Sequence, residues 1–222
     1  EHLLALEENS CPSAGACQGM YTANTMACLT EVIGMSLPYC SSASAVSAQK
    51  RRIAFESGMQ VVELVKKDLK PSDIITRESL RNAITADLAL GGSTNTFLHI
   101  LAIANAGGIN ITLNDFEDLS AKIHQIVKIN PSSTLTMTDF HNAGGVPAVI
   151  KSLENFLVDT QTASGLSVKE IANSAWVDTE IIPPYEKSTY TQSGLAVLYG
   201  NLAKDGCVIK TSGVAPECYE FE

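Results

Sequence analysis

Two cysteines in one short segment are the residues of this chain best suited to chemistry. Cys11 and Cys17 stand in residues 11–26, CPSAGACQGMYTANTM, among small side chains that leave the backbone N–H groups open to a ligand. A helix is predicted to begin shortly after Cys17, and the partial positive charge of its N-terminus favours a thiolate. Such a thiolate can bind a metal or react as a nucleophile. The alternative is that both cysteines are small buried side chains, as free cysteines commonly are.

A second polar segment follows a pair of glycines. Residues 91–95, GGSTN, place two hydroxyl groups and an amide at the start of another predicted helix. Backbone N–H groups at such a start can hold a carboxylate or a phosphate, whereas a simple helix N-cap at Ser93 is the structural alternative. His99 follows Asn95 by one helical turn and can face the same pocket. A core position for His99 is equally compatible with the sequence.

The elements that position these residues are predicted mainly from apolar side chains at helical spacing. Thr76 is expected to cap a helix whose Leu80, Ile84 and Leu88 face the core. Alternating apolar residues and turn signals predict short strands near the C-terminus. Further helices are expected over residues 21–35, 48–69, 93–107, 112–127 and 146–157 and after Ser167, and strands over 135–137, 195–199 and 207–211.

The sequence pattern changes after Trp176, where segments typical of extended and turn structure replace helical patterns. We expect an α/β fold in which residues 1–180 belong to a layered, helix-rich N-terminal domain. Residues 181–222 would then form a linker and the first strands of a β-barrel-like C-terminal domain. Because helical and strand-like patterns reach both ends of the chain, we expect it to be a central piece of a longer protein.

Composition excludes several classes of function. A net charge of −9 argues against binding to nucleic acid, which requires clustered basic side chains. The longest apolar region, residues 97–106, is too short to cross a membrane. Six cysteines without short repeated spacings, in a chain rich in aliphatic residues, indicate a reduced, intracellular protein. The cytoplasm, the mitochondrial matrix and the plastid are all compatible.

Four blocks of sequence, in order, resemble the dihydroxy-acid dehydratase family. The blocks are residues 11–26, residues 91–95 followed by His99, residues 139–149 (DFHNAGGVPAV), and residues 194–203 (GLAVLYGNLA) with 210–214 (KTSGV). Together they span nearly the whole chain. The resemblance implies a hydro-lyase that converts 2,3-dihydroxy-3-methyl acids to 2-keto acids in the biosynthesis of branched-chain amino acids. It also implies a homodimer acting on a small-molecule substrate.

The resemblance further implies an iron–sulfur cluster beside a Mg²⁺ ion. Cys17 matches a cluster ligand of the family, which makes it the metal-binding and cofactor-binding residue of this stretch, and Cys11 a structural neighbour. Ser93, Thr94 and Asn95 would line the substrate pocket. The sequence leaves open whether the cluster is 2Fe–2S or 4Fe–4S.

The chain also departs from the family pattern. Gln18 stands where the family usually has glycine. A glutamine would strain the backbone if this position requires a positive φ. The family's Cys-Asp-Lys segment and its Thr-Asp-Gly-Arg-Phe-Ser segment do not occur, so the Mg²⁺ ligands, two cluster ligands and the base are expected outside this stretch. Alternatives are a sugar-acid or 6-phosphogluconate dehydratase and a non-catalytic homologue that acts as a binding or regulatory protein.

Overall fold

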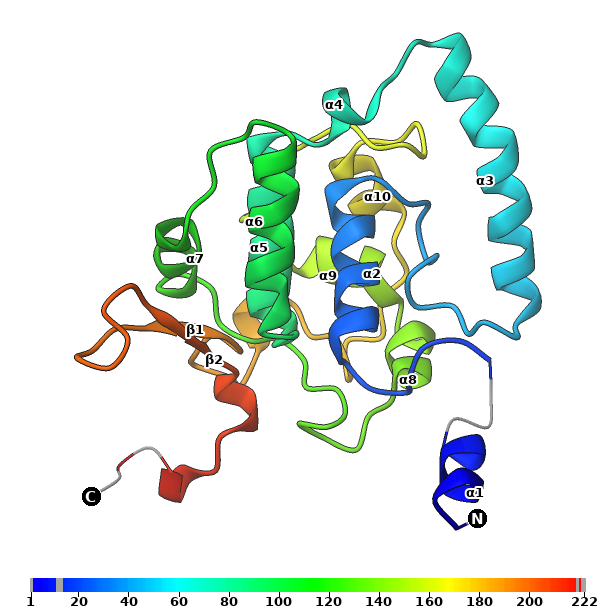
Figure 1. Ribbon diagram of the computed structural model, residues 1–222. Coiled ribbons are helices and arrows are strands. Elements are labelled where there is room, and N and C mark those ends of the chain that lie inside the picture. Colours follow the sequence, from blue (N-terminus) through cyan, green and yellow to red (C-terminus); the bar gives the residue numbers. More distant parts are fainter. Residues whose placement is uncertain (1, 11–13, 219, 221–222) are drawn as a thin grey trace.

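A computed structural model describes residues 2–10, 14–218 and 220 of the chain as a helical body with a small β hairpin at one end (Figure 1). The helices are α1 (His2–Asn9), α2 (Thr22–Ile33), α3 (Ala48–Lys66), α4 (Pro71–Ile74), α5 (Arg77–Leu90), α6 (Asn95–Ala106), α7 (Leu113–Ser120), α8 (Met137–Asn142), α9 (Gly145–Ser152) and α10 (Val168–Ser174). The strands are β1 (Ala196–Leu198) and β2 (Cys207–Ile209). The expected order of a helix-rich portion followed by the first strands is confirmed.

The core forms around α5, which contacts α2, α6 and α7. Leu80, Ile84 and Leu88 of α5 are fully buried, as their helical spacing predicted. Thr76 caps this helix, because its side chain accepts a hydrogen bond of 3.2 Å from the backbone N–H of Ser79. Helices α9 and α10 pack against each other, and α9 also contacts α2, which completes the helical body (Figure 1).

Helix α3 lies along one edge of the molecule (Figure 1). Ser47 caps its N-terminus through a hydrogen bond of 3.1 Å from the backbone N–H of Lys50. Ile53 is its buried residue, whereas Phe55 and Met59 are exposed. The helix predicted over residues 48–69 is therefore present, and it ends three residues early, just before Asp68 adopts a positive φ of 51°.

The two strands form an antiparallel hairpin in which Ala196 lies opposite Ile209. Both strands are shorter than predicted, with three residues each. The hairpin is joined to the helical body just before β1, where the backbone N–H of Gly194 donates a hydrogen bond of 3.0 Å to the carbonyl of Leu88. This contact places the C-terminal segment at the end of α5.

Two predicted helices are present but shorter than expected, and one predicted strand is absent. The helix predicted over residues 112–127 ends at Ser120, because Gln125 and Ile126 donate their backbone hydrogen bonds to Gln192 and Ala89. The strand predicted over residues 135–137 is absent, since Thr136 caps α8 at that point. The helix predicted over residues 146–157 ends at Ser152 and continues as turns. The spacing of apolar residues along the sequence does not reveal these competing hydrogen-bond partners.

Glu31 is a buried acidic residue on α2, and it holds the loop that follows that helix. It is 2% exposed. Its carboxylate accepts hydrogen bonds from the backbone N–H groups of Tyr39 at 2.7 Å and Ser41 at 3.1 Å, and from the Ser41 hydroxyl at 2.5 Å. Burial raises the pKa of Glu31 from an ordinary value of 4.5 to about 7, and these hydrogen bonds only partly oppose the shift.

This raised pKa predicts that the contribution of Glu31 to stability declines as the pH rises. Between pH 4.5 and pH 7 the folded state binds more protons than the unfolded state at Glu31, so this contribution is fully present below pH 4.5 and is lost as the pH rises to about 7. We expect Glu31→Gln, which cannot ionise, to reduce this loss by about 2 kcal/mol. Urea denaturation at several pH values between 4.5 and 8 measures it. Glu56→Gln, at an exposed position of α3, serves as the control; an identical pH dependence in both variants would contradict the prediction.

Candidate active site

Cys17 lies on an exposed loop that two glycines attach to the protein body. Gly15 has a φ of +99°, and a Cβ there would lie 2.6 Å from the Cβ of Ala45. A Cβ at Gly19 would lie 2.7 Å from the carbonyl oxygen of Asn130. Only glycine fits these two close approaches, which leave the Cys17 thiol accessible between them. The thiol is thus exposed, which contradicts the alternative of a buried cysteine at this position.

Backbone hydrogen bonds hold the same loop from several directions. The N–H of Met20 donates to the carbonyl of Asn130, and the N–H of Met137 donates to the carbonyl of Gln18, both at 2.7 Å. Positive φ among the described non-glycine residues is confined to Tyr39 and Asp68. Gln18 therefore replaces the family's glycine without backbone strain. Cys11, expected to be a structural neighbour, lies outside the described residues.

Asn24 supports the Cys17 loop from inside α2, a role that the sequence analysis missed. Its side chain is 5% exposed. The Asn24 Nδ2 group donates hydrogen bonds to the carbonyls of Cys17 at 2.5 Å and Gly19 at 2.7 Å. An asparagine in the first turn of a helix that follows a glycine-rich loop was the available signal, because asparagine side chains readily bond to nearby backbone groups.

The structure brings two of the predicted pocket residues to the start of α2. Thr22 Oγ1 shares a hydrogen bond of 2.9 Å with Ser93 Oγ, and it accepts a hydrogen bond of 2.7 Å from Asn95 Nδ2. Thr22 is five residues after Cys17 in the chain. The starts of α2 and α6 therefore meet through one threonine that was not singled out from the sequence.

The helix that follows the glycine pair begins two residues later than predicted. Thr94 is exposed and occupies the N-cap of α6, without a capping hydrogen bond from its side chain. Ser93 Oγ accepts a hydrogen bond of 3.2 Å from the N–H of Asn95. His99 is exposed, so the alternative that placed it in the core is wrong. Ser93, Thr94 and Asn95 thus form a polar helix start that is partly open to solvent.

Replacing Thr22 by valine tests this junction. The variant keeps the shape of the side chain but removes the partner of both Ser93 and Asn95, so we expect a loss of about 1 kcal/mol in the free energy of unfolding. Thr30→Val on the same helix is the control, because the Thr30 hydroxyl donates to the carbonyl of Met26 within α2 and connects no other segment that the structure describes. Urea denaturation measures the free energy of unfolding of both variants. A loss in Thr22→Val that is equal to or smaller than the loss in Thr30→Val would contradict a stabilising role for the hydrogen bonds of Thr22.

The described residues fit one ligand of an iron–sulfur cluster and not a complete site. Cys17 offers an accessible thiol, and soft thiolates are the usual ligands of such clusters. Within residues 2–10, 14–218 and 220, no group of three or more His, Cys, Asp or Glu side chains is placed to hold a metal ion. Further ligands would have to come from other parts of the complete protein.

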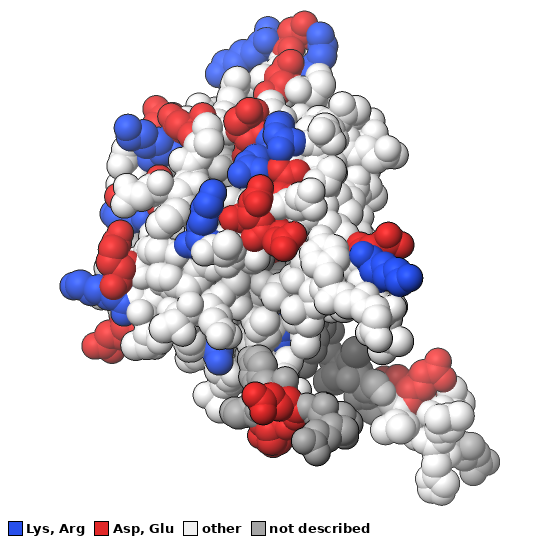
Figure 2. Space-filling view, turned by 90° about the vertical axis from the view of Figure 1, so that its left-hand side faces the viewer, with Lys and Arg blue, Asp and Glu red and all other residues white. Residues whose placement is uncertain are grey.

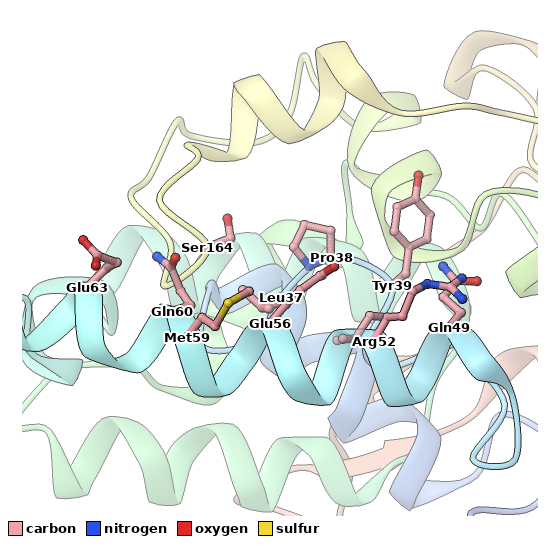
Figure 3. Close-up of a pocket in the computed structure, with 11 residues that line it drawn as sticks. Leu37, Pro38, Tyr39, Gln49, Arg52, Glu56, Met59, Gln60, Glu63 and Ser164 are labelled. Carbon is pink, nitrogen blue, oxygen red and sulfur yellow. The ribbon is translucent and has the colours of Figure 1, made fainter.

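A cavity of about 750 Å³ lies elsewhere, between α3 and the loop that contains Leu37 and Tyr39 (Figure 3). In the close-up, Gln49, Arg52 and Glu63 line its α3 side. None of the candidate residues discussed above lines this cavity. Its lining mixes apolar side chains with charged and amide groups and does not form a constellation of reactive groups, so the candidate site remains at the starts of α2 and α6.

The distribution of charged side chains on the outer surface does not point to a particular class of partner. On the face shown in Figure 2, acidic and basic side chains are interspersed over the upper part, and uncharged residues dominate the lower part. Among the described residues, no helix combines the length and the apolar character needed to span a bilayer.

Comparison with known proteins gives matches over almost the entire chain. The family model described as Dihydroxy-acid/6-phosphogluconate dehydratase N-terminal matches residues 1–171, and the corresponding C-terminal model matches residues 180–222. A dihydroxy-acid dehydratase of Methanococcus aeolicus is 49% identical over 100% of this chain and 41% of its own length. The dihydroxy-acid dehydratase of Endomicrobium trichonymphae is 50% identical over 100% of the chain and 40% of its own length. The chain thus spans about two fifths of the length of these relatives.

Proposed function

Because this chain belongs to the dihydroxy-acid/6-phosphogluconate dehydratase family, we propose that the complete protein is a dihydroxy-acid dehydratase. Its reaction removes the proton on C2 and the hydroxyl group on C3 of a 2,3-dihydroxy-3-methyl acid as one molecule of water. The resulting enol tautomerises to a 2-keto acid. The observation that carries this proposal is the identity of about half of all residues, over the whole chain, with proteins named dihydroxy-acid dehydratase.

In the proposed enzyme, Cys17 is a ligand of an iron–sulfur cluster. Its exposed thiol and the small residues around it support this role. When bound, the cluster and a Mg²⁺ ion supply Lewis acidity for the departing hydroxyl group and for the substrate carboxylate. Ligands for the Mg²⁺ ion and the base lie outside this stretch in the proposed enzyme.

Ser93, Thr94 and Asn95 bind the substrate in this proposal. Thr22 fixes the side chains of Ser93 and Asn95, so these polar groups are oriented before the substrate arrives. Hydroxyl and amide groups at the start of α6, together with the partial positive charge of that helix start, suit a carboxylate. The pocket would therefore orient the acid end of the substrate.

The proposal places the protein in branched-chain amino acid biosynthesis as an intracellular homodimer. In this role it acts on small molecules and on neither nucleic acids nor membranes. The cytoplasm, the mitochondrial matrix and the plastid are all compatible with it.

An anaerobic assay of the complete protein tests the function. We expect 2,3-dihydroxy-3-methylbutanoate to be converted to the 2-keto acid, and 6-phosphogluconate and sugar acids to be poor substrates. A reversed preference would move the protein to the sugar-acid or phosphogluconate branch of the family. A protein that carries its cluster but dehydrates none of these acids would instead be a non-catalytic homologue.

A further inference from the structure

The segment that joins α2 to α3, residues 34–47, forms one wall against the Cys17 loop. We call this segment the α2–α3 loop. Ala45 belongs to it, and the approach of Gly15 is so close that a Cβ at Gly15 would lie 2.6 Å from the Cβ of Ala45. A displacement of the α2–α3 loop would therefore reach the Cys17 loop directly, through the residue two positions before the thiol.

Helix α8 forms a second wall. The backbone N–H of Met137, the first residue of α8, donates a hydrogen bond of 2.7 Å to the carbonyl of Gln18. The start of this helix is itself well fixed, because Thr136 and Asp139 exchange hydrogen bonds of 2.8 Å and 3.3 Å in a capping box. The Cys17 loop is thus held by the α2–α3 loop just before the thiol and by α8 just after it.

His141, on the last turn of α8, joins these two walls. Its Nδ1 atom lies 2.9 Å from the Ser42 hydroxyl of the α2–α3 loop, and its Nε2 atom lies 3.0 Å from Oε1 of Gln49 in the first turn of α3. An amide oxygen can only accept, so Nε2 carries the proton and Nδ1 accepts a hydrogen bond from Ser42. Burial lowers the pKa of His141, which favours this neutral form of the ring.

The side chain of Ser42 is enclosed where it meets His141. Ser42 is 5% exposed, and a Cβ at Gly145, at the start of α9, would lie 2.6 Å from its Oγ atom. The His141 ring also packs edge-on against the ring of Tyr39, with 6.1 Å between the ring centroids and 87° between the ring planes. The α2–α3 loop is therefore attached to α8 at two of its residues, and both attachments go through one imidazole ring.

We propose that His141 is a positioning residue that fixes the α2–α3 loop relative to α8 and thereby places the Cys17 thiol. The contacts form a closed series through His141, Ser42, Ala45, Gly15, Gln18 and Met137. Because the series is closed, loss of the bond between His141 and Ser42 frees the α2–α3 loop to move, and the Cys17 loop with it. The effect of His141 on the cluster and on dehydration rests on the proposed function, whereas its effect on the loop does not.

Hydrogen–deuterium exchange of the complete protein tests the positioning directly. His141→Phe keeps an aromatic ring but removes both hydrogen bonds, so we expect the peptide that spans residues 14–20 to exchange roughly fivefold faster. His141→Asn should restore slow exchange, because its side-chain oxygen can replace Nδ1 as the acceptor for Ser42. His124→Phe is the matched control, since His124 is also half-buried, stacks on Tyr185 and bonds through Nε2 to the Tyr185 carbonyl at 3.1 Å. Equal exchange of this peptide in His141→Phe and His124→Phe would overturn the proposal.

The bond between His141 and Ser42 is tested from its other end. Ser42→Ala removes the hydroxyl group, and it should also accelerate exchange in residues 14–20. The double variant should exchange no faster than His141→Phe alone, because the bond is already missing. Additive effects would overturn the role of this bond. If His141→Phe does not fold, Ser42→Ala still decides the matter, since unchanged exchange in that variant contradicts the proposal.

Iron release and kinetics then separate this inference from the proposed function. In a protein that carries its cluster, we expect His141→Phe to lose iron to a chelator roughly fivefold faster and to lower kcat roughly fivefold. KM for the dihydroxy acid should change by less than about twofold, and His141→Asn should recover most of both losses. Unchanged iron release and kcat in His141→Phe would contradict a role in placing Cys17. A wild-type protein that binds no cluster and dehydrates no acid would refute the proposed function, while the exchange measurements would still decide on His141.

Discussion

Replacing Cys17 by alanine is expected to lower the rate of dehydration by at least about 100-fold while the protein remains folded. Loss of a group that merely supports a metal ligand commonly costs 10- to 100-fold, so loss of the ligand itself should cost no less. The fold should survive because the loop is held through main-chain groups: Asn24 bonds to the carbonyl of Cys17, and Met20 bonds to the carbonyl of Asn130. Neither bond involves the thiol.

The comparison with a second exposed cysteine gives this experiment its specificity. Cys207, at the start of β2, is also exposed and free. Iron and sulfide content, the visible absorption spectrum and the turnover of 2,3-dihydroxy-3-methylbutanoate should fall in Cys17→Ala and stay at the wild-type level in Cys207→Ala. A Cys17→Ala protein with full iron content would show that this thiol is not a ligand.

Replacing Gly194 by alanine is expected to destabilise the protein by about 3 kcal/mol. A Cβ at this position would lie 2.3 Å from the Cα and 2.8 Å from the backbone nitrogen of Gly91. Both atoms belong to the left-handed end of α5, where Gly91 has a φ of +60°, and main chain in that position cannot move aside as a flexible side chain can. The alanine therefore separates the C-terminal segment from α5 and breaks the bond to Leu88.

Thermal and urea denaturation of the complete protein measure this effect. Gly200→Ala is the matched control, because a Cβ there would meet no atom within 4 Å. We expect Gly200→Ala to change the free energy of unfolding by less than about 1 kcal/mol. Similar losses in the two variants would mean that the close approach of Gly194 to Gly91 does not hold the C-terminal segment in place.

Much of the fold could be predicted from the sequence because the signals are local. The burial of Leu80, Ile84 and Leu88 follows from helical spacing, and the start of α5 follows from a threonine cap. The order of helices followed by short strands depends on the same kind of pattern. The motifs around Cys17 and Ser93 likewise indicated the family without any tertiary information, because the identity and order of residues are sufficient for that purpose.

The ends of several elements were decided only by tertiary contacts. Residues 121–127 carry apolar side chains that a continuing helix could also have buried. They leave the helix after Ser120 because the backbone N–H groups of Gln125 and Ile126 donate to distant carbonyl groups. A periodic pattern of apolar residues shows which face of a segment is apolar. It does not show which distant carbonyl groups will accept hydrogen bonds from the backbone N–H groups of that segment.

The sequence by itself determined the family and the types of residue available for chemistry in this protein. The tertiary structure alone decided that Thr22 joins Ser93 to Asn95, that Asn24 supports the Cys17 loop, and that the Lys210 side chain reaches the carbonyl of Met20. The partners in two of these relations are separated by more than 70 positions in the chain. Hydrogen bonds and charge interactions depend on distance in space, which the order of residues does not specify until the core has packed.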